Sequence, residues 1–287
     1  MAGAHISLSK INLSRPSTFA ASSAYGRRPI IASVTQNLSY LDSIHYDIDS
    51  NLKKAIPSHG PISVLEPMHH LTFTPPKSNA SALCIAACEL VGGDRDDAIV
   101  AASSIHLMHA AIHSREHLLL TGRVKTKLEP EPKIPYKFGS DIELLTGNGI
   151  MSFGFELLAG SKNLTSKNSN KILRVIIEIT RAIGSQGMVH DQDYETEYDQ
   201  PPSRQLHGCG AMCGAILGGG NEEEIERLKR YGVYVGKIQG LLSGIGRNDG
   251  GKMQLAKKWR ALAMKELEYF DSEKVEHIIS SFVKFHY

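Results

Sequence analysis

The chain has 287 residues, of which 41% are apolar and 22% are charged, and its formal net charge at pH 7 is +2. A chain of this length can bury one large hydrophobic core, and no stretch approaches the roughly 20 consecutive apolar residues that a membrane-spanning helix needs. Residues 1–41 hold four basic residues and no acidic one, so residues 42–287 have a net charge of −2. The body of the chain therefore lacks the basic surface of a nucleic-acid-binding protein.

The first 41 residues have a composition of their own. They hold eight serines, one lysine and three arginines, and the first acidic residue of the chain is Asp42. Serine-rich, arginine-containing segments without acids are typical of organelle transit peptides, and no continuous apolar core indicates a secretory signal. We predict a disordered transit peptide over residues 1–41 and a folded domain over residues 42–287. A disordered tail without a targeting role is the alternative.

The body of the chain has the pattern of helices separated by loops. A helix is expected from Asp42, with Asp42 or Ser43 as its N-terminal cap, until the prolines at 57, 61 and 67 break it. Further helices are predicted on both sides of a Gly-Gly-Asp break within residues 81–122, and over residues 141–159, 171–184, 206–217, 221–242, 252–270 and 273–286. Loops are predicted over residues 75–79, 125–138 and 191–202. With no strand alternation and no internal repeat, the prediction is an all-α, single-domain bundle of roughly ten or more helices.

All four cysteines lie in two Cys-x-x-x-Cys pairs, Cys84/Cys88 and Cys209/Cys213. Spacing of four places each pair on one helical face, about one turn apart. Zinc sites more often use Cys-x-x-Cys, so a metal site is a secondary interpretation. Cysteine also packs as a small hydrophobe, and the alanines and glycines beside each pair indicate that two helices approach closely there.

Four histidines form a stripe within one helical face, because their spacing is i, i+3, i+7 and i+11: His106, His109, His113 and His117. Residues 113–117 also spell His-x-x-Glu-His, a pattern in which two histidines bind zinc and the glutamate is the base. Such a site needs a third ligand from a distant segment, and Glu195 or Glu197 is a candidate. A metal-dependent enzyme is therefore one alternative for the function. The simpler interpretation of the four histidines is a polar stripe that faces a cavity.

The run Leu83–Gly93, Leu-Cys-Ile-Ala-Ala-Cys-Glu-Leu-Val-Gly-Gly, closely resembles a segment of plant geranylgeranyl diphosphate synthases. The resemblance implies the all-helical isoprenoid synthase-type bundle. In that family the next helix carries Asp-Asp-x-x-x-x-Asp, which binds magnesium and an allylic diphosphate. The matching positions here are Glu116, His117 and Gly122. The positions that match the family's second aspartate-rich motif are Ser243, Gly244 and Arg247.

Other diphosphate-binding positions of the family are altered as well. In the loop Gly-Gly-Lys-Arg-x-Arg-Pro, Lys77 matches the lysine, while Ser78 and Ala80 stand at the arginine positions. A lone flexible ammonium is a poor substitute for two guanidinium groups on a diphosphate. The family run His-Lys-Thr-Gly-Ala-Leu matches residues 207–212, which lack the lysine and threonine. The resemblance therefore implies a chain that is not an enzyme by itself and binds no magnesium of its own.

Two Cys-x-x-x-Cys motifs in such a chain resemble the small subunits of plant heteromeric geranyl(geranyl) diphosphate synthases, and the resemblance covers residues 40–287. It implies that both cysteine pairs mediate binding to a catalytic geranylgeranyl diphosphate synthase subunit, which holds the Mg2+. It also implies a plastid stroma location and a heterodimer or heterotetramer. The expected function is to shift or stimulate the partner's output toward geranyl diphosphate; a second type of small subunit, which enhances geranylgeranyl diphosphate formation, is the alternative.

Overall fold

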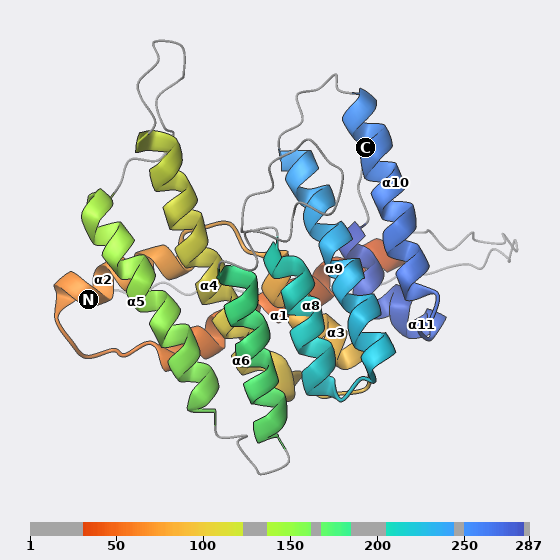
Figure 1. The fold of residues 1–287 in the computed structure, drawn as a ribbon, viewed down its shortest axis with the longest axis horizontal. Helices are drawn as coiled ribbons and strands as arrows, with labels where there is room; N and C mark the ends of the chain where they lie inside the picture. The colour runs from red at the N-terminus through yellow and green to blue at the C-terminus, as the bar shows by residue number, and fades with distance from the viewer. Residues whose placement is uncertain (1–30, 123–136, 162–167, 185–204, 244–249, 284–287) are drawn as a thin grey trace, which may run out of the picture.

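The computed structural model describes residues 31–122, 137–161, 168–184, 205–243 and 250–283 (Figure 1). The regular secondary structure of these residues is helical and includes no strand, which confirms the predicted all-α bundle. The α-helices are α1 (Ile31–Ala55), α2 (Ile62–Phe73), α3 (Asn79–Leu90), α4 (Arg95–Gly122), α5 (Ser140–Ala159), α6 (Ser169–Ile183), α8 (Gln205–Gly218), α9 (Glu222–Ser243), α10 (Gly250–Leu267) and α11 (Ser272–Lys274). A π-helical turn (Val275–Ile279) and a 3-10 turn (Ser280–Val283) follow.

Helices α3 and α8 form the centre of the bundle. Every residue of α8 from Leu206 to Leu217 is buried, and so are residues 80–88 of α3. Helix α8 packs against α3, α9, α6 and α4. Helix α5 packs against α4, and α10 packs against α9. In Figure 1, α2, α4, α5 and α6 therefore lie on one side of α8, and α9 and α10 lie on the other. None of the helices in the described part of the chain is long and apolar enough to cross a membrane.

Several helices begin and end where their local sequence predicts. The periodic apolar residues of α6 are buried at Ile172, Val175 and Ile179, and the helix ends before Gly184. Asn221 caps α9 reciprocally with Glu224: the Glu224 N–H donates to Asn221 Oδ1 at 3.0 Å, and the Asn221 N–H donates to Glu224 Oε2 at 2.7 Å. These boundaries depend on side chains within one turn of the helix end, which is why the sequence predicts them.

The first helix begins earlier than predicted. Helix α1 starts at Ile31, so Asp42 and Ser43 lie inside it and do not cap it. No proline or glycine interrupts residues 31–55, and one buried stripe along the helix consists of Ile44, Ile48 and Leu52, each at most 1% exposed. The predicted boundary between residues 41 and 42 therefore falls within a helix, while residues 1–30 of the predicted transit peptide lie outside the described residues.

A charged network fastens α1 to the turn between α3 and α4. Arg95 donates to Glu89 Oε1 at 2.8 Å and to Asp47 Oδ2 at 2.6 Å, and its guanidinium lies 5.5 Å from the ring centroid of Tyr40. Tyr40 donates its hydroxyl hydrogen to Glu89. Burial, followed by this bond to Glu89, raises the pKa of Tyr40 above its ordinary value, so the hydroxyl stays protonated. The N-terminal end of the described core is thus held by polar as well as apolar contacts.

The C-terminal segment is less regular than the predicted helix over residues 273–286. After one α-helical turn it widens into the π-helical turn and then tightens into the 3-10 turn. The fully buried Tyr231 of α9 donates its hydroxyl hydrogen to the Ile279 carbonyl at 2.8 Å. This contact joins residues 48 positions apart, so a local periodicity argument could not predict the change in helix type.

Candidate functional site

The four cysteines meet where α3 crosses α8. All of them are buried: Cys84, Cys88 and Cys213 are 0% exposed and Cys209 is 5% exposed. The Sγ atoms of Cys209 and Cys213 lie 3.8 Å apart, and the Cys88 thiol donates to the Asp94 carbonyl at 3.4 Å. The two pairs, 125 positions apart in sequence, are therefore parts of one contact inside this chain.

Glycines of α8 make this close contact possible. A Cβ atom added at Gly210 would lie 2.1 Å from the Ala80 carbonyl oxygen, and one at Gly214 would lie 1.9 Å from the Cys84 carbonyl oxygen. One turn further, a Cβ at Gly218 would lie 2.7 Å from the Cys88 carbonyl oxygen. Only a hydrogen atom fits at these positions. We call this contact, formed by residues 80–88 of α3 and 209–218 of α8, the α3–α8 seam.

Three of the thiols, those of Cys84, Cys88 and Cys213, have pKa values above the ordinary value for cysteine. Burial raises the pKa of Cys84 and raises that of Cys88 to about 12, where the carboxylates of Asp97 and Glu89 add to the effect. The pKa of Cys213 is raised by its bond with Cys209 and by burial. Neutral buried thiols are poor nucleophiles and poor metal ligands. Across the described ranges, no three His, Cys, Asp or Glu side chains are grouped so that they could hold a metal ion.

In the seam the cysteines act as small packing residues, in agreement with the interpretation that two helices approach closely at the cysteine pairs. Their predicted part in binding a partner stays a prediction, and the geometry limits how it could operate. Because the thiols contact neighbouring helices of their own chain, they would influence a partner through the position of α8 and of α6, which packs on it. A partner would not touch the thiols themselves.

The positions that match the two aspartate-rich motifs lie near the C-terminal ends of α4 and α9. Glu116 and His117 belong to the last two turns of α4, which ends at Gly122, and α9 ends at Ser243. Both helices end on the upper side of Figure 1. Gly244 and Arg247 lie outside the described residues.

These positions do not fit a set of magnesium ions, because Mg2+ prefers oxygen ligands and usually binds through carboxylates. Among the six residues at the two motifs, only Glu116 has a carboxylate, and Arg247 has a positive charge. Imidazole, hydroxyl and glycine positions cannot replace the missing acids. The residues at these positions therefore provide one carboxylate between them, that of Glu116.

Lys77, the matching lysine of the diphosphate loop, pairs with this chain's own acid. Its Nζ lies 3.0 Å from Asp49 Oδ2 of α1, with 51% of the lysine side chain exposed. Ser78, at a family arginine position, instead caps α3 by accepting from the Ala80 N–H at 3.1 Å. In this chain the loop therefore provides the N-terminal cap of α3.

The histidine stripe lies along α4, where His106 is buried and His109 and His113 are half-buried. His106 is 4% exposed and bonds through Nε2 to the Thr72 carbonyl at 2.9 Å. His109 Nδ1 is buried without a hydrogen-bond partner, and the ring of His113 lies 6.1 Å from the His109 ring. From α8, His207 bonds to Gln239 at 2.8 Å. His117 is on α4, and the proposed zinc ligands Glu195 and Glu197 lie outside the described residues. The metal-enzyme alternative therefore stays a prediction.

We expect this stripe to make the fold sensitive to acid. Burial lowers the pKa of His106 and lowers that of His109 to about 3, where His106, His207 and His113 add to the effect. The unfolded chain, with histidine pKa values near 6.5, then binds more protons than the folded chain. Stability is therefore complete above about pH 7 and decreases as the pH falls below about 6.5, by about 1 kcal/mol from His109 alone between pH 7.5 and 5.5.

Urea unfolding across that pH range tests the expectation. The His109→Gln variant should show a shallower decrease than the wild type, because one neutral buried imidazole is gone. Replacing the exposed His69 with glutamine is the matched control and should leave the pH dependence unchanged. Equal slopes for wild type and His109→Gln would contradict the burial argument.

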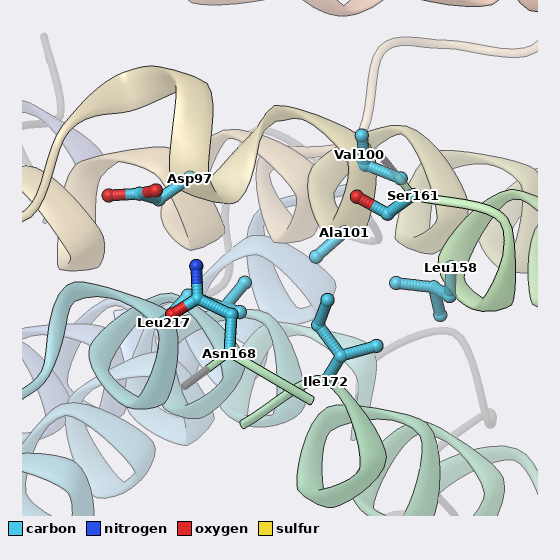
Figure 2. Close-up of a pocket in the computed structure, with 8 residues that line it drawn as sticks. All are labelled: Asp97, Val100, Ala101, Leu158, Ser161, Asn168, Ile172 and Leu217. Carbon is cyan, nitrogen blue, oxygen red and sulfur yellow. The ribbon is translucent and has the colours of Figure 1, made fainter. Parts of the chain in front are cut away.

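A small cavity lies between α4, α6 and the end of α8 (Figure 2). Its volume is about 20 Å3, and Figure 2 shows the side chains of Asp97, Asn168 and Ser161 together with apolar residues around it. A cavity of this size holds about one water molecule. It is far too small for a prenyl diphosphate, so it is not a substrate site.

An exposed apolar surface on α5 and α6 was missed by the sequence reasoning. These helices lie side by side in Figure 1; α5 packs on α4, and α6 packs on α8. Five large apolar side chains on them are between 40% and 69% exposed: Ile142, Leu144, Leu145, Leu173 and Ile177. We call this set the α5–α6 apolar face. The signal for it was available, because Leu144-Leu145 and Leu173 fall outside the buried helical periodicity of their segments.

Comparisons with known proteins agree with this architecture. No family model matches the sequence. The chain is 43% identical, over 262 residues, to heterodimeric geranylgeranyl pyrophosphate synthase small subunit 2, chloroplastic, of Cannabis sativa, which covers 84% of this chain and 90% of that protein. Among solved structures, the geranyl diphosphate synthase small subunit of Antirrhinum majus is 47% identical with a TM-score of 0.71, covering 86% of this chain and 98% of that one.

A second solved structure, a mint deletion mutant of heterotetrameric geranyl pyrophosphate synthase, is 41% identical with a TM-score of 0.71 and covers 86% of this chain and 100% of that chain. The matches extend over nearly the whole of each relative, so they concern the complete fold and not one motif. Together with the helical bundle, they establish the relationship. The chain belongs to the small-subunit family of the heteromeric geranyl(geranyl) diphosphate synthases, which have the all-helical trans-isoprenyl diphosphate synthase fold.

Proposed function

We propose that this chain is a non-catalytic regulatory subunit. It binds a catalytic geranylgeranyl diphosphate synthase subunit in the plastid stroma and shifts or stimulates its output toward geranyl diphosphate. The observation that carries the proposal is that α4 and α9 are retained while the carboxylates at both aspartate-rich positions are lost, Glu116 excepted. The names of sequence relatives, which are heterodimeric geranylgeranyl pyrophosphate synthase small subunits called chloroplastic, support the same role.

The chemistry of the reaction explains why the loss is decisive. In synthases of this fold, magnesium ions offset the charge that develops on a departing diphosphate. The donor set of this chain cannot hold those ions, so they bind to the catalytic partner. Lys77, paired with Asp49 at 3.0 Å, adds no free pair of guanidinium groups for a second diphosphate.

The α5–α6 apolar face is the surface that supports docking best. Large apolar side chains are exposed on both helices, as at a protein–protein contact, whereas the four cysteines are buried in the seam. The seam positions α8, and α6 packs on α8. The cysteine pairs thus support partner binding indirectly, by fixing the position of α6 in the heterodimer or heterotetramer.

A single pair of assays tests the proposal. Purified alone with magnesium, dimethylallyl diphosphate and isopentenyl diphosphate, the chain is expected to form no prenyl product above the blank. Mixed with a catalytic geranylgeranyl diphosphate synthase subunit, it is expected to co-purify with it and to raise the fraction of ten-carbon product. Turnover by the lone chain at a rate like that of the catalytic subunit would overturn the proposal.

The names of the relatives also favour a second candidate, since the Cannabis sativa protein is called a geranylgeranyl pyrophosphate synthase small subunit. A subunit of that kind enhances twenty-carbon product without shortening it. Product chain length in the mixture separates the two: faster synthesis with unchanged length favours the second candidate, and a shift to ten carbons favours the first.

A further inference from the structure

Helix α10 differs in charge from the rest of the chain. Residues 42–287 have a net charge of −2, but residues 250–265 have a net charge of +5, so the remainder of the body has a net charge of −7. The only acid of α10 is Glu266, whose carboxylate lies 3.0 Å from the guanidinium of Arg230 on α9. The net charge of the body therefore conceals one strongly positive stretch, which holds five bases and no acid: Lys252, Lys257, Lys258, Arg260 and Lys265.

Three of these lysines lie on the outer side of α10. The helix packs on α9, and its buried residues recur at helical spacing: Ala256, Trp259, Ala263 and Leu267. Lys257, Lys258 and Lys265 are exposed. Residues seven or eight positions apart are separated by two helical turns on one side, so the three ammonium groups belong to the same outer face. In Figure 1, α10 lies outermost on the side of α9, away from α5 and α6.

The outer face of α10 is apolar between its lysines. Ala261 is exposed and Met264 is 36% exposed, and both lie on the same side of the helix as the lysines. Lysine is a compact, hydrated charge on a flexible stem, whereas the fork of arginine binds a single carboxylate in a fixed geometry. Flexible lysines around an adaptable methionine therefore suit a wide, fluid anionic surface better than the fixed carboxylates of a folded protein.

We infer that the outer face of α10, formed by Lys257, Lys258, Ala261, Met264 and Lys265, docks on a lipid bilayer that carries anionic headgroups. The lysines supply the attraction to the headgroups, and Met264 enters the boundary between headgroups and acyl chains. The chain then lies on the membrane surface through one side of the bundle, and α5 and α6 on the other side stay accessible.

The inference goes beyond the proposed function and does not depend on it. Its basis is the charge, the exposure and the spacing of residues on α10. If the proposed function also holds, the regulatory subunit brings the catalytic subunit to a membrane. An apolar prenyl chain is then released beside the phase in which such chains dissolve.

Sedimentation of the full chain with lipid vesicles tests the inference. Vesicles of phosphatidylcholine with about one third phosphatidylglycerol should bind the wild type, and vesicles of phosphatidylcholine alone should not. Raising the salt concentration from about 0.05 M to about 0.5 M should release the bound chain, because ions screen the attraction between lysines and headgroups. Equal binding to the two kinds of vesicle would overturn the inference.

Removing the three lysine charges tests the place of the contact. The triple variant Lys257→Gln, Lys258→Gln and Lys265→Gln should bind the anionic vesicles roughly 100-fold more weakly, since each lysine near an anionic surface contributes about fivefold. Its melting temperature should equal that of the wild type, because all three side chains are exposed. Wild-type vesicle binding by the folded variant would show that other residues hold the membrane and that the inference is wrong.

The matched control removes three basic charges elsewhere on the surface. Lys53→Gln, Lys54→Gln and Arg181→Gln are combined in one variant, since these residues are exposed on α1 and α6. This variant has the same net charge as the α10 variant and keeps the basic residues 1–41, so it should bind vesicles like the wild type. An equal loss in both variants would mean that overall charge causes the binding, and it would contradict the inference.

A polyglutamate chain distinguishes the other occupant. If the wild type binds polyglutamate through the α10 lysines and does not bind anionic vesicles, the face takes an acidic polypeptide and the inference is wrong. The α10 variant should still co-purify with a catalytic geranylgeranyl diphosphate synthase subunit. A wild type that binds anionic vesicles but no catalytic subunit would overturn the proposed function and leave the membrane contact intact.

Discussion

Replacing Gly214 with alanine is expected to destabilise the chain by about 3–5 kcal/mol, enough to unfold many domains of this size. The new Cβ would lie 1.9 Å from the Cys84 carbonyl oxygen and 2.8 Å from the carbonyl carbon. Both are backbone atoms, so no side-chain rotation relieves the clash and α3 and α8 must separate. The loss of packing along the α3–α8 seam greatly exceeds the gain of about 1 kcal/mol that alanine brings to an isolated helix.

Urea or thermal unfolding of purified protein measures this effect, and Gly149→Ala is its matched control. Both substitutions add one methyl group inside a helix, but the added carbon at Gly149 meets nothing within 4 Å. The control should therefore stabilise the chain by about 0.5–1 kcal/mol. Similar stability for Gly214→Ala and the wild type would refute the seam as described.

Shortening the chain from its N-terminus should have the second large effect. A chain that starts at Ile31 keeps all of α1 and is expected to be as stable as the full chain. A chain that starts at Asp42 lacks Tyr40, its bond to Glu89 and its contact with Arg95, and it should lose about 1–2 kcal/mol. The predicted boundary at residue 41 thus removes residues that belong to the folded core.

A start at Asp49 should prevent folding. It removes Ile44 and Ile48, which are at most 1% exposed, at about 2 kcal/mol each, and it removes the Asp47 carboxylate that accepts from Arg95 at 2.6 Å. The sum approaches the whole stability of an ordinary domain. Circular dichroism and urea unfolding of the three shortened chains measure the series. Equal stability for starts at Ile31 and Asp49 would show that α1 is dispensable.

The shortened chains also bear on targeting. If the first residues form a transit peptide that is removed in the plastid, the cut must leave Tyr40 in place for the core to keep its full stability. Mass spectrometry of the chain recovered from plastids would give the new N-terminus. A start after Asp47 in stable protein would contradict the role assigned to the network around Arg95.

Some of the fold was predictable because its causes are local. The ends of α6 and α9 depend on Gly184 and on the pair Asn221 and Glu224, all within one turn of the helix they bound. The helical repeat of α6 is visible in its apolar spacing. The predicted start of α1 at Asp42 was wrong, because helix α1 begins at Ile31. A residue that can cap a helix does not end it when the residues before it are also compatible with a helix.

The candidate site also has features that the sequence predicts and features that depend on tertiary packing. The residue types at the positions that match the aspartate-rich motifs, Glu116, His117 and Ser243, are visible in the sequence, because the identity of a possible ligand is a property of one residue. The burial of Cys84 and Cys213 is not, because it depends on glycines of α8 that approach carbonyl groups of α3. The α5–α6 apolar face depends equally on which sides of two helices the bundle leaves uncovered.

The sequence by itself determined the helical class, most helix boundaries and the family, because each depends on residue identity or on spacing within a few turns. Only the tertiary structure decided that the two cysteine pairs meet in one buried seam, that α1 continues upstream of the predicted domain and that the α5–α6 apolar face is left exposed. Those features arise when helices that are separate in the sequence pack together, as in the seam between segments 125 residues apart. Spacing along a chain does not specify which helix faces meet.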